Sequence, residues 1–221
     1  MKILHSSGTM LSPQQRRLRN RQEMIDNILA AARAIMREEG VAALNLNEVA
    51  RRVGLRTPSL YVYFPGKAAI YDAVYLLAIR LHCERMKVAF AEHKEVWDRF
   101  RAALETNMAF ALEHPELYQM AFERPVPGFA PTEQTMQAAL EALNELTVMV
   151  RLHLEQGDLA PGVSFEVGYN LMIAMMHGLT TLHAANEPHL PVGSGRYGSL
   201  IPAAVSLFKS SWGTNQLGDS S

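Results

Sequence analysis

The stretch NLNEVARRVGLRTPSLYVYF, residues 45–64, decides the fold of the amino-terminal third of this chain. Asn45 stands three residues before Glu48, the spacing of a side-chain cap with a carboxylate that reaches back, which resembles a capping box. The apolar positions that follow keep a helical period until Gly54 interrupts them. The pattern therefore predicts a short helix that begins after Asn45 and ends at Gly54.

A second short helix is expected to begin at Thr57. Threonine can cap the free amides of a helix, and Pro58 fits the first helical position because its missing N–H would have no partner there. Leu60 and Phe64 stand four residues apart and are placed to bury one face. The Pro65–Gly66 dipeptide closes this helix by about Phe64.

A longer helix is predicted upstream of both. Residues 23–39 repeat apolar side chains at intervals of three and four, the spacing of one helical face, and Gly40 ends the run. Three helices, the last two short and joined by a tight glycine turn, form a helix-turn-helix pattern. Such a helix fits the major groove of B-DNA, where its first residues reach base edges and flanking groups reach phosphates. The segment therefore predicts a DNA-binding unit.

The charge distribution agrees with a polyanionic partner. Residues 1–67 contain eleven Lys/Arg against five Asp/Glu, a balance of +6, whereas residues 68–221 contain ten against seventeen, a balance of −7. Arginines at positions 51, 52 and 56 come just before the small hydroxyls of the expected recognition helix. The two tyrosines of that helix either offer their hydroxyls to DNA or pack as core residues, and the sequence leaves both readings open.

The apolar residues in the rest of the chain recur with a helical period, which predicts a helical domain. Long helices are predicted within residues 68–93 and 96–114, followed by a short helix and a proline-rich loop in residues 114–131. No strand and no internal repeat is predicted. The remaining expected helices are a long one from Thr132 to about Gln156, an apolar one over residues 164–184, and a last one from about Ser199 to Trp212.

Residues 24–74 resemble the first four helices of the TetR/AcrR family of one-component transcriptional regulators, in order and in spacing. The leucine–tyrosine pair usual in that family matches Leu60–Tyr61, and its aromatic–phenylalanine pair matches Tyr63–Phe64. The family's lysine at the start of the fourth helix matches Lys67. This likeness implies a regulator that binds operator DNA.

The resemblance implies phosphate contacts by Tyr61 and Lys67 and base contacts by residues 57–59. Three positions depart from the family pattern. Arg56 stands where many members have serine, Asn45 replaces the customary Thr/Ser cap, and Tyr63 stands where histidine is frequent. The candidate DNA-binding residues are Asn45, Arg56, Thr57, Pro58, Ser59, Tyr61, Tyr63 and Lys67.

The helices after Lys67 resemble the family's effector and dimerisation domain in their layout. In such proteins the last two long helices pair with their copies, and here the helix over residues 164–184 is apolar nearly all round and needs cover on several sides. A homodimer is therefore expected. A ligand cavity is implied by the resemblance, and the twelve methionines either line such an apolar site or pack as plain core. The candidate ligand-binding residues are Met108, Tyr118, Met149, Met172, Met175, Met176 and His177.

Signals for other functions fail. The segment GSGRYG, residues 193–198, has the spacing of a dinucleotide-binding fingerprint, but no predicted strand precedes it, so it is interpreted as a helix connection. The histidines lack the spacing of helical metal ligands, and the single Cys83 excludes an internal disulfide. The longest apolar run, Leu171–Met176, is far short of the roughly 20 residues of a membrane span. We expect no enzymatic activity, cofactor, metal or membrane association, and a cytoplasmic location, because the start of the chain lacks a secretory pattern.

The sequence thus predicts an all-α protein with an amino-terminal three-helix helix-turn-helix DNA-binding domain and a carboxy-terminal helical effector and dimerisation domain. The expected boundaries are a flexible basic arm at residues 1–20, the DNA-binding domain at 21–66, the ligand-binding and dimerisation domain at 67–213, and a polar tail at 214–221. The predicted function is a ligand-responsive transcriptional regulator, a repressor released from a palindromic double-stranded DNA operator by a small, largely apolar molecule. The alternative is a constitutive DNA-binding architectural protein without an effector.

Overall fold

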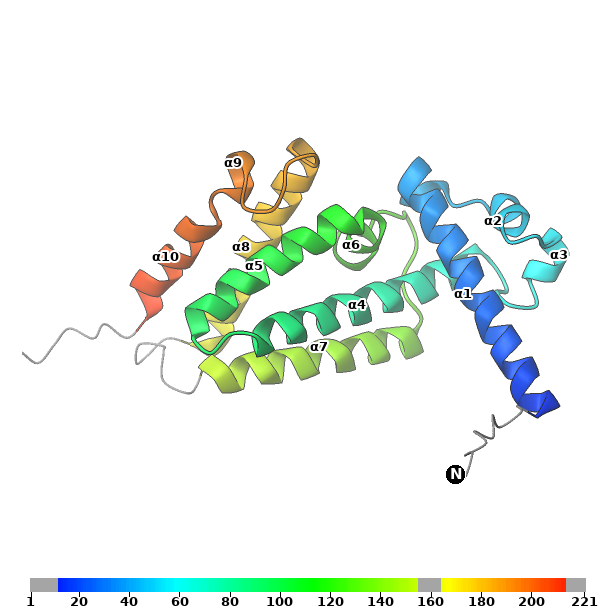
Figure 1. Cartoon of the computed structure of the whole chain (residues 1–221), viewed down its shortest axis with the longest axis horizontal. Helices are drawn as coiled ribbons and strands as arrows, with labels where there is room; N and C mark the ends of the chain where they lie inside the picture. Colours follow the sequence, from blue (N-terminus) through cyan, green and yellow to red (C-terminus); the bar gives the residue numbers. More distant parts are fainter. Residues whose placement is uncertain (1–11, 155–163, 214–221) are drawn as a thin grey trace, which may run out of the picture. The chain divides into compact units, whose positions relative to one another are not determined.

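The computed structural model describes residues 12–154 and 164–213. The chain divides into two compact units, residues 1–70 and 71–221. Every regular element in the described residues is a helix (Figure 1), which confirms the predicted all-α class. Among these helices none is both long and apolar enough to cross a membrane.

The first unit contains α1 (Pro13–Glu39), the short 3-10 helix η1 (Val41–Ala43), α2 (Leu46–Arg52) and α3 (Thr57–Leu60). Helix α1 packs against η1 and α2, and α2 packs against α3. The side chains of α1 that this packing buries recur at three and four residues, as the sequence predicted, and they are Ile28, Ala32, Ile35 and Met36.

Helix α1 begins earlier than predicted, at Pro13 and not at Glu23. Ser12 forms a capping box with Gln15: the Ser12 hydroxyl accepts from the Gln15 amide, and the Gln15 side chain accepts from the Ser12 amide. Residues 13–20, predicted as part of a flexible arm, are therefore the first turns of a helix, stabilised by this cap without an apolar face. Residues 1–11 lie outside the described part of the chain.

The turn between α2 and α3 is built as the sequence indicated. The Asn45 side-chain oxygen accepts hydrogen bonds from the amides of Asn47 and Glu48 and so caps α2. Gly54 has a φ of +70°, a left-handed conformation that glycine adopts without strain, and it turns the chain after α2. Helix α3 itself is shorter than predicted.

The α-helical part of α3 ends at Leu60, and the chain continues as a hydrogen-bonded turn to Phe64. The amides of Tyr63 and Phe64 both donate to the Leu60 carbonyl. Leu60 is fully buried and Phe64 is buried, so these two side chains anchor α3 to the unit as their spacing predicted.

The second unit is built around α5 (Val96–Glu113), which contacts α6 (Pro115–Phe122), α8 (Phe165–Asn186) and α10 (Ile201–Trp212). Helix α7 (Glu133–Leu154) is tied to α4 (Lys67–Ala91) by hydrogen bonds from Thr132 and Thr135 to Asp72. The predicted extension of α7 to Gln156 lies outside the described residues. Between α8 and α10, the GSGRYG segment forms a turn and the one-turn helix α9 (Gly195–Gly198), a connection as predicted.

Candidate functional site

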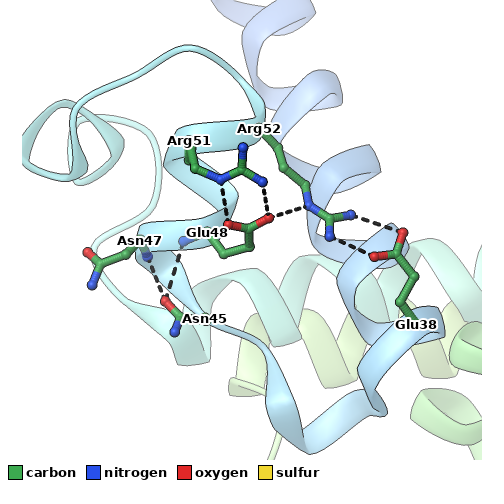
Figure 2. Close-up of polar contacts among 6 residues, drawn as sticks. All are labelled: Glu38, Asn45, Asn47, Glu48, Arg51 and Arg52. Carbon is green, nitrogen blue, oxygen red and sulfur yellow. Dashed lines mark hydrogen bonds and ion pairs between the residues drawn. The ribbon is translucent and has the colours of Figure 1, made fainter.

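An arginine on α2 ties the helix-turn-helix to α1. The Arg52 guanidinium donates to the Glu38 carboxylate on α1 at 2.6 Å and to the Glu48 carboxylate on α2 at 2.8 Å (Figure 2). Arg51 grips Glu48 with two further hydrogen bonds of 2.7 Å. Glu48 is therefore held by arginines and does not reach back to the Asn45 amide, which corrects the capping-box prediction for this helix.

The same contacts shift the acid–base equilibrium of the two glutamates. Hydrogen bonds from Arg51 and then from Arg52 lower the pKa of Glu48 to about 2. A hydrogen bond from Arg52 likewise lowers the pKa of Glu38. Both carboxylates are ionised near neutral pH, so Glu38 and Glu48 neutralise the charges of Arg51 and Arg52 through contacts within the chain.

Arg56, by contrast, is exposed and has no hydrogen-bond or ion-pair partner among the described residues. It is the residue just before α3, and Pro58 and Ser59 are exposed within that helix. Thr57 does not cap α3 as predicted, because its hydroxyl donates to the Asn47 side chain at 2.8 Å. Arg56, Pro58 and Ser59 thus present exposed side chains at the start of the predicted recognition helix, with Thr57 partly buried between them.

Neither Tyr61 nor Tyr63 belongs to the buried core, so the structure does not support the reading of these tyrosines as core residues. Tyr61 is 50% exposed. Tyr63 is half-buried beneath the Arg21 guanidinium, 5.3 Å from the ring centroid, and Arg21 also donates to the Val62 carbonyl. Lys67 donates to the Ala42 carbonyl at 3.0 Å, so its ammonium also fixes the start of α4 against η1.

A cavity of about 110 Å³ lies among α4, α5, α6, α7 and α8 of the second unit. Its walls are almost entirely apolar, and α4 contributes side chains at intervals of four residues. The lining residues are His82, Met86 and Phe90 of α4; Val96, Arg99, Phe100 and Ala103 of α5; Phe122 of α6; Leu143, Leu146 and Val150 of α7; and Tyr169, Met172, Ile173, Met176 and His177 of α8.

Three of the seven predicted ligand-binding residues line this cavity, namely Met172, Met176 and His177. Tyr118 lies behind its wall, where its hydroxyl is 2.8 Å from Nδ1 of His177. The other predicted methionines lie elsewhere: Met108 is buried core, Met149 is half-buried against the core, and Met175 lines a groove between α8 and α10.

The sequence predicted His177 but missed two other polar residues of the cavity lining, His82 and Arg99. His82 is buried, and its Nε2 lies 2.9 Å from Oδ1 of Asn107, whose side-chain amide donates to the Thr180 hydroxyl at 2.8 Å. Burial lowers the pKa of His82 to about 4 and also lowers the pKa of His177. Arg99, the arginine of the lining, donates through Nε to the carbonyls of Phe90 and His93. The sequence offered one signal for this: His82 is a polar residue within the apolar helical repeat of residues 68–93.

The outer side of α8 forms a second apolar feature, which we call the α8–α10 groove. Leu171, Leu182 and Leu207 are exposed, and Met175 and Phe208 lie between them. Gly178 sits in this groove, and a side chain added there would meet nothing within 4 Å. The helix that was predicted to need cover on several sides thus has an exposed apolar face on this side.

A helix-turn-helix unit followed by a helical domain with an apolar cavity defines a DNA-binding regulator. Profile comparison supports this class: residues 28–74 match "Bacterial regulatory proteins, tetR family", and residues 100–196 match "Tetracyclin repressor-like, C-terminal domain". The chain belongs to the TetR family of transcriptional regulators, whose members are DNA-binding proteins and not enzymes.

Individual relatives are distant. The nucleoid occlusion factor SlmA of Vibrio cholerae is 24% identical over 195 residues, covering 84% of this chain and 96% of the relative. The HTH-type transcriptional repressor DrrR1 of Streptomyces coeruleorubidus is 27% identical over 151 residues, covering 66% of this chain and 50% of the relative. A TetR family transcription regulator from Marinobacter aquaeolei has the same fold, with a TM-score of 0.66 and 18% identity, covering 89% of this chain and 98% of that one.

The hydrogen bonds from Arg51 and Arg52 to Glu48 predict that the Glu48 carboxylate makes a pH-dependent contribution to the stability of the protein. Because the pKa of Glu48 is depressed from 4.5 to about 2, its contribution is complete above about pH 4.5 and is lost as the pH falls toward 2. Glu48→Gln should therefore lower the free energy of unfolding at neutral pH, and the difference from wild type should shrink below about pH 4.5. Urea unfolding at a series of pH values measures this. Glu92→Gln is the control, an exposed change outside the cluster; a Glu48→Gln difference that stayed constant with pH would contradict the prediction.

Proposed function

We propose that this protein is a ligand-responsive transcriptional regulator that acts as a homodimer in the cytoplasm and leaves its palindromic operator when a small, largely apolar molecule binds. DNA binding is assigned to residues 21–66, and ligand binding and dimerisation to residues 67–213. The observation on which the proposal depends is the apolar cavity of about 110 Å³ in the second unit. A protein that only bound DNA would have no need of such a cavity, since well-packed cores leave few voids.

The surface around α3 supports the DNA-binding half of the proposal. Arg56, Pro58, Ser59 and Tyr61 are all exposed, and Thr57 lies beside them with its hydroxyl bonded to Asn47. Arg56 brings a charge that no described protein group neutralises. We propose that Arg56, Tyr61, Tyr63 and Lys67 contact phosphates, that residues 57–59 read bases, and that Asn45 orients α2 through its cap.

Helix α4 offers a route from the cavity to the DNA-binding unit. Its residues His82, Met86 and Phe90 line the cavity, and its first residues, from Lys67 to Ile70, belong to the DNA-binding unit. A ligand that fits best when α4 is displaced would favour that state. The two recognition helices of a dimer would then no longer match successive major grooves. Such coupling requires only that the ligand bind one of the two states more tightly.

A second candidate function is constitutive DNA binding without an effector. The observation that favours it is the match to the nucleoid occlusion factor SlmA of Vibrio cholerae, which aligns over 84% of this chain. The two candidates differ in one measurable property: a small molecule releases the DNA in the first and has no effect in the second. Whether the protein represses or activates transcription can be measured with a reporter gene placed downstream of an operator selected from random DNA. The proposal predicts repression.

The exposed arginine beside α3 gives a prediction for DNA binding. Arg56→Ala should weaken DNA binding and reduce the slope of log K against log salt by about 0.9 for each phosphate that the arginine neutralises. Arg51→Ala is the matched control, since that guanidinium is already bound by Glu48, and it should change the slope less. Fluorescence anisotropy with an operator selected from random DNA gives both slopes. Equal slopes for Arg56→Ala and wild type would remove Arg56 from the phosphate contacts.

The α8–α10 groove gives a prediction for assembly. Leu182→Glu places a charge in the apolar surface proposed to meet its copy, and it should convert the dimer to a monomer at micromolar concentration. Leu140→Glu on α7 is the control, because Leu140 is similarly exposed but lies outside the groove. Sedimentation velocity distinguishes the two species. A dimeric Leu182→Glu variant would place the dimer interface elsewhere.

The cavity gives a prediction for ligand response. Met176→Trp should fill it and weaken the response, while operator affinity without ligand stays within about tenfold, roughly 1.4 kcal/mol. The measurement is titration of a diverse set of compounds against a preformed protein–operator complex. Met136→Trp, on the exposed side of α7, is the control and should respond as wild type. If no compound released wild-type protein from DNA, the effector-free function would replace the proposed one.

A further inference from the structure

The cavity contains a histidine that is bonded on one side only. His82, on α4, lines the cavity and is 3% exposed. Its Nε2 lies 2.9 Å from Oδ1 of Asn107. Its Nδ1 is buried and has no hydrogen-bond partner in the described part of the chain.

The neighbours of Asn107 decide which nitrogen of His82 has the proton. The Asn107 amide group donates to the Thr180 hydroxyl at 2.8 Å, so its carbonyl oxygen is the atom turned toward His82. A carbonyl oxygen can only accept, which makes Nε2 the protonated nitrogen of a neutral ring. Nδ1 is then unprotonated and has a lone pair that can accept one hydrogen bond.

Among the described residues, none donates a hydrogen bond to that lone pair. The His82 ring makes T-shaped contacts with the rings of Phe110 and Phe122, at centroid-to-centroid distances of 5.3 and 5.0 Å. Burial holds the pKa of His82 at about 4, so the ring is neutral near pH 7. The other cavity histidine, His177, already has its Nδ1 bonded to the Tyr118 hydroxyl.

The charged group of the lining stands at a distance. Arg99 binds the carbonyls of Phe90 and His93 at the carboxy-terminal end of α4. Phe90 is two intervals of four residues along α4 from His82, roughly 12 Å at 1.5 Å per residue. Arg85, whose charge also acts on His82, is bound by the Glu113 carboxylate at 2.7 Å and is not part of the cavity lining. Both arginines are therefore engaged by protein groups, and neither is free to balance an anionic ligand group beside His82.

We propose that the cavity binds an uncharged, mainly apolar molecule whose hydroxyl or N–H group donates a hydrogen bond to Nδ1 of His82. The inference rests on the proposed function, because it names the class of effector for the same cavity. A buried acceptor without a partner is costly, so a ligand that supplies a donor is favoured over an analogue that lacks one. A carboxylate would instead place its own lone pairs against that of Nδ1.

The test uses matched probes with and without a donor: phenol and anisole, 1-naphthol and 1-methoxynaphthalene, and 4-phenylphenol and 4-methoxybiphenyl. Affinities are measured by calorimetry on the full-length protein, for wild type and for His82→Phe. The ratio of the methoxy Kd to the hydroxyl Kd should fall about tenfold in the variant, a change of 1.4 kcal/mol. Comparing ratios cancels the difference in hydration between the two probes of each pair.

Met86→Leu is the matched control, because Met86 lines the cavity one helical turn from His82 and has no hydrogen-bonding role in the proposal. It should shift both members of a pair by the same factor. The inference would be overturned if the ratio were the same in wild type and His82→Phe, if no probe bound, or if 1-naphthoate bound wild type more tightly than 1-naphthol.

A second measurement keeps the inference testable if His82→Phe does not fold. In wild-type protein labelled with ¹⁵N-histidine, Nε2 of His82 should be the protonated nitrogen, and the Nδ1 resonance should move upfield with 1-naphthol but not with 1-methoxynaphthalene. A protonated Nδ1, or an equal response to both probes, would overturn the inference.

The outcomes separate this inference from the proposed function. Donor-selective binding that left the operator complex intact would support the inference and count against ligand-responsive regulation. If compounds without a donor group released the DNA as well as compounds that have one, the result would support ligand-responsive regulation and count against the inference about His82.

Discussion

The second unit depends on one buried amide. Asn107 is fully buried in α5, where an unpaired amide would cost about 1–3 kcal/mol, and its two hydrogen bonds reach His82 on α4 and Thr180 on α8. The three helices therefore have a fixed register at this level. Because α4, α5 and α8 also form most of the cavity wall, the same bonds help to position the cavity and determine which nitrogen of His82 has the proton.

The DNA-binding unit obeys a different constraint. Helices α2 and α3 are too short to be stable alone, since helices of fewer than about twelve residues are marginal in water. They are held mainly by burial of Val49, Ala50 and Leu60, and the arginine contacts of Glu48 and Glu38 add to this. Exposed ion pairs contribute little to stability. The effect of these ion pairs is to neutralise the charges of Arg51 and Arg52. Arg56, beside α3, is exposed and has no ion-pair partner among the described residues.

Helix α8 serves two surfaces at once. Neighbouring residues on a helix point roughly 100° apart, so Met175 lies in the α8–α10 groove while Met176 faces the cavity. A single helix thus borders both the proposed ligand site and the proposed dimer interface. Packing around the cavity accounts for the apolar residues on one side of the helix, and cover by a second copy in the proposed dimer would account for those on the exposed groove side.

The sequence by itself determined the all-α class and the helix-turn-helix, because their signals are local: the Asn45 cap, the left-handed Gly54 and the four-residue spacing of Leu60 and Phe64. A local signal was also present for the early start of α1, in the spacing of Ser12 and Gln15, although the absence of an apolar face obscured it.

The tertiary structure alone decided which polar residues meet. His82 and Thr180 lie 25 and 73 residues from Asn107 along the chain, and nothing in their spacing indicates that one amide joins them. It also decided which methionines line the cavity and which pack as core, because a methionine on an apolar helix fits either place equally well. Only the packing of α4, α5, α7 and α8 against one another separates the two.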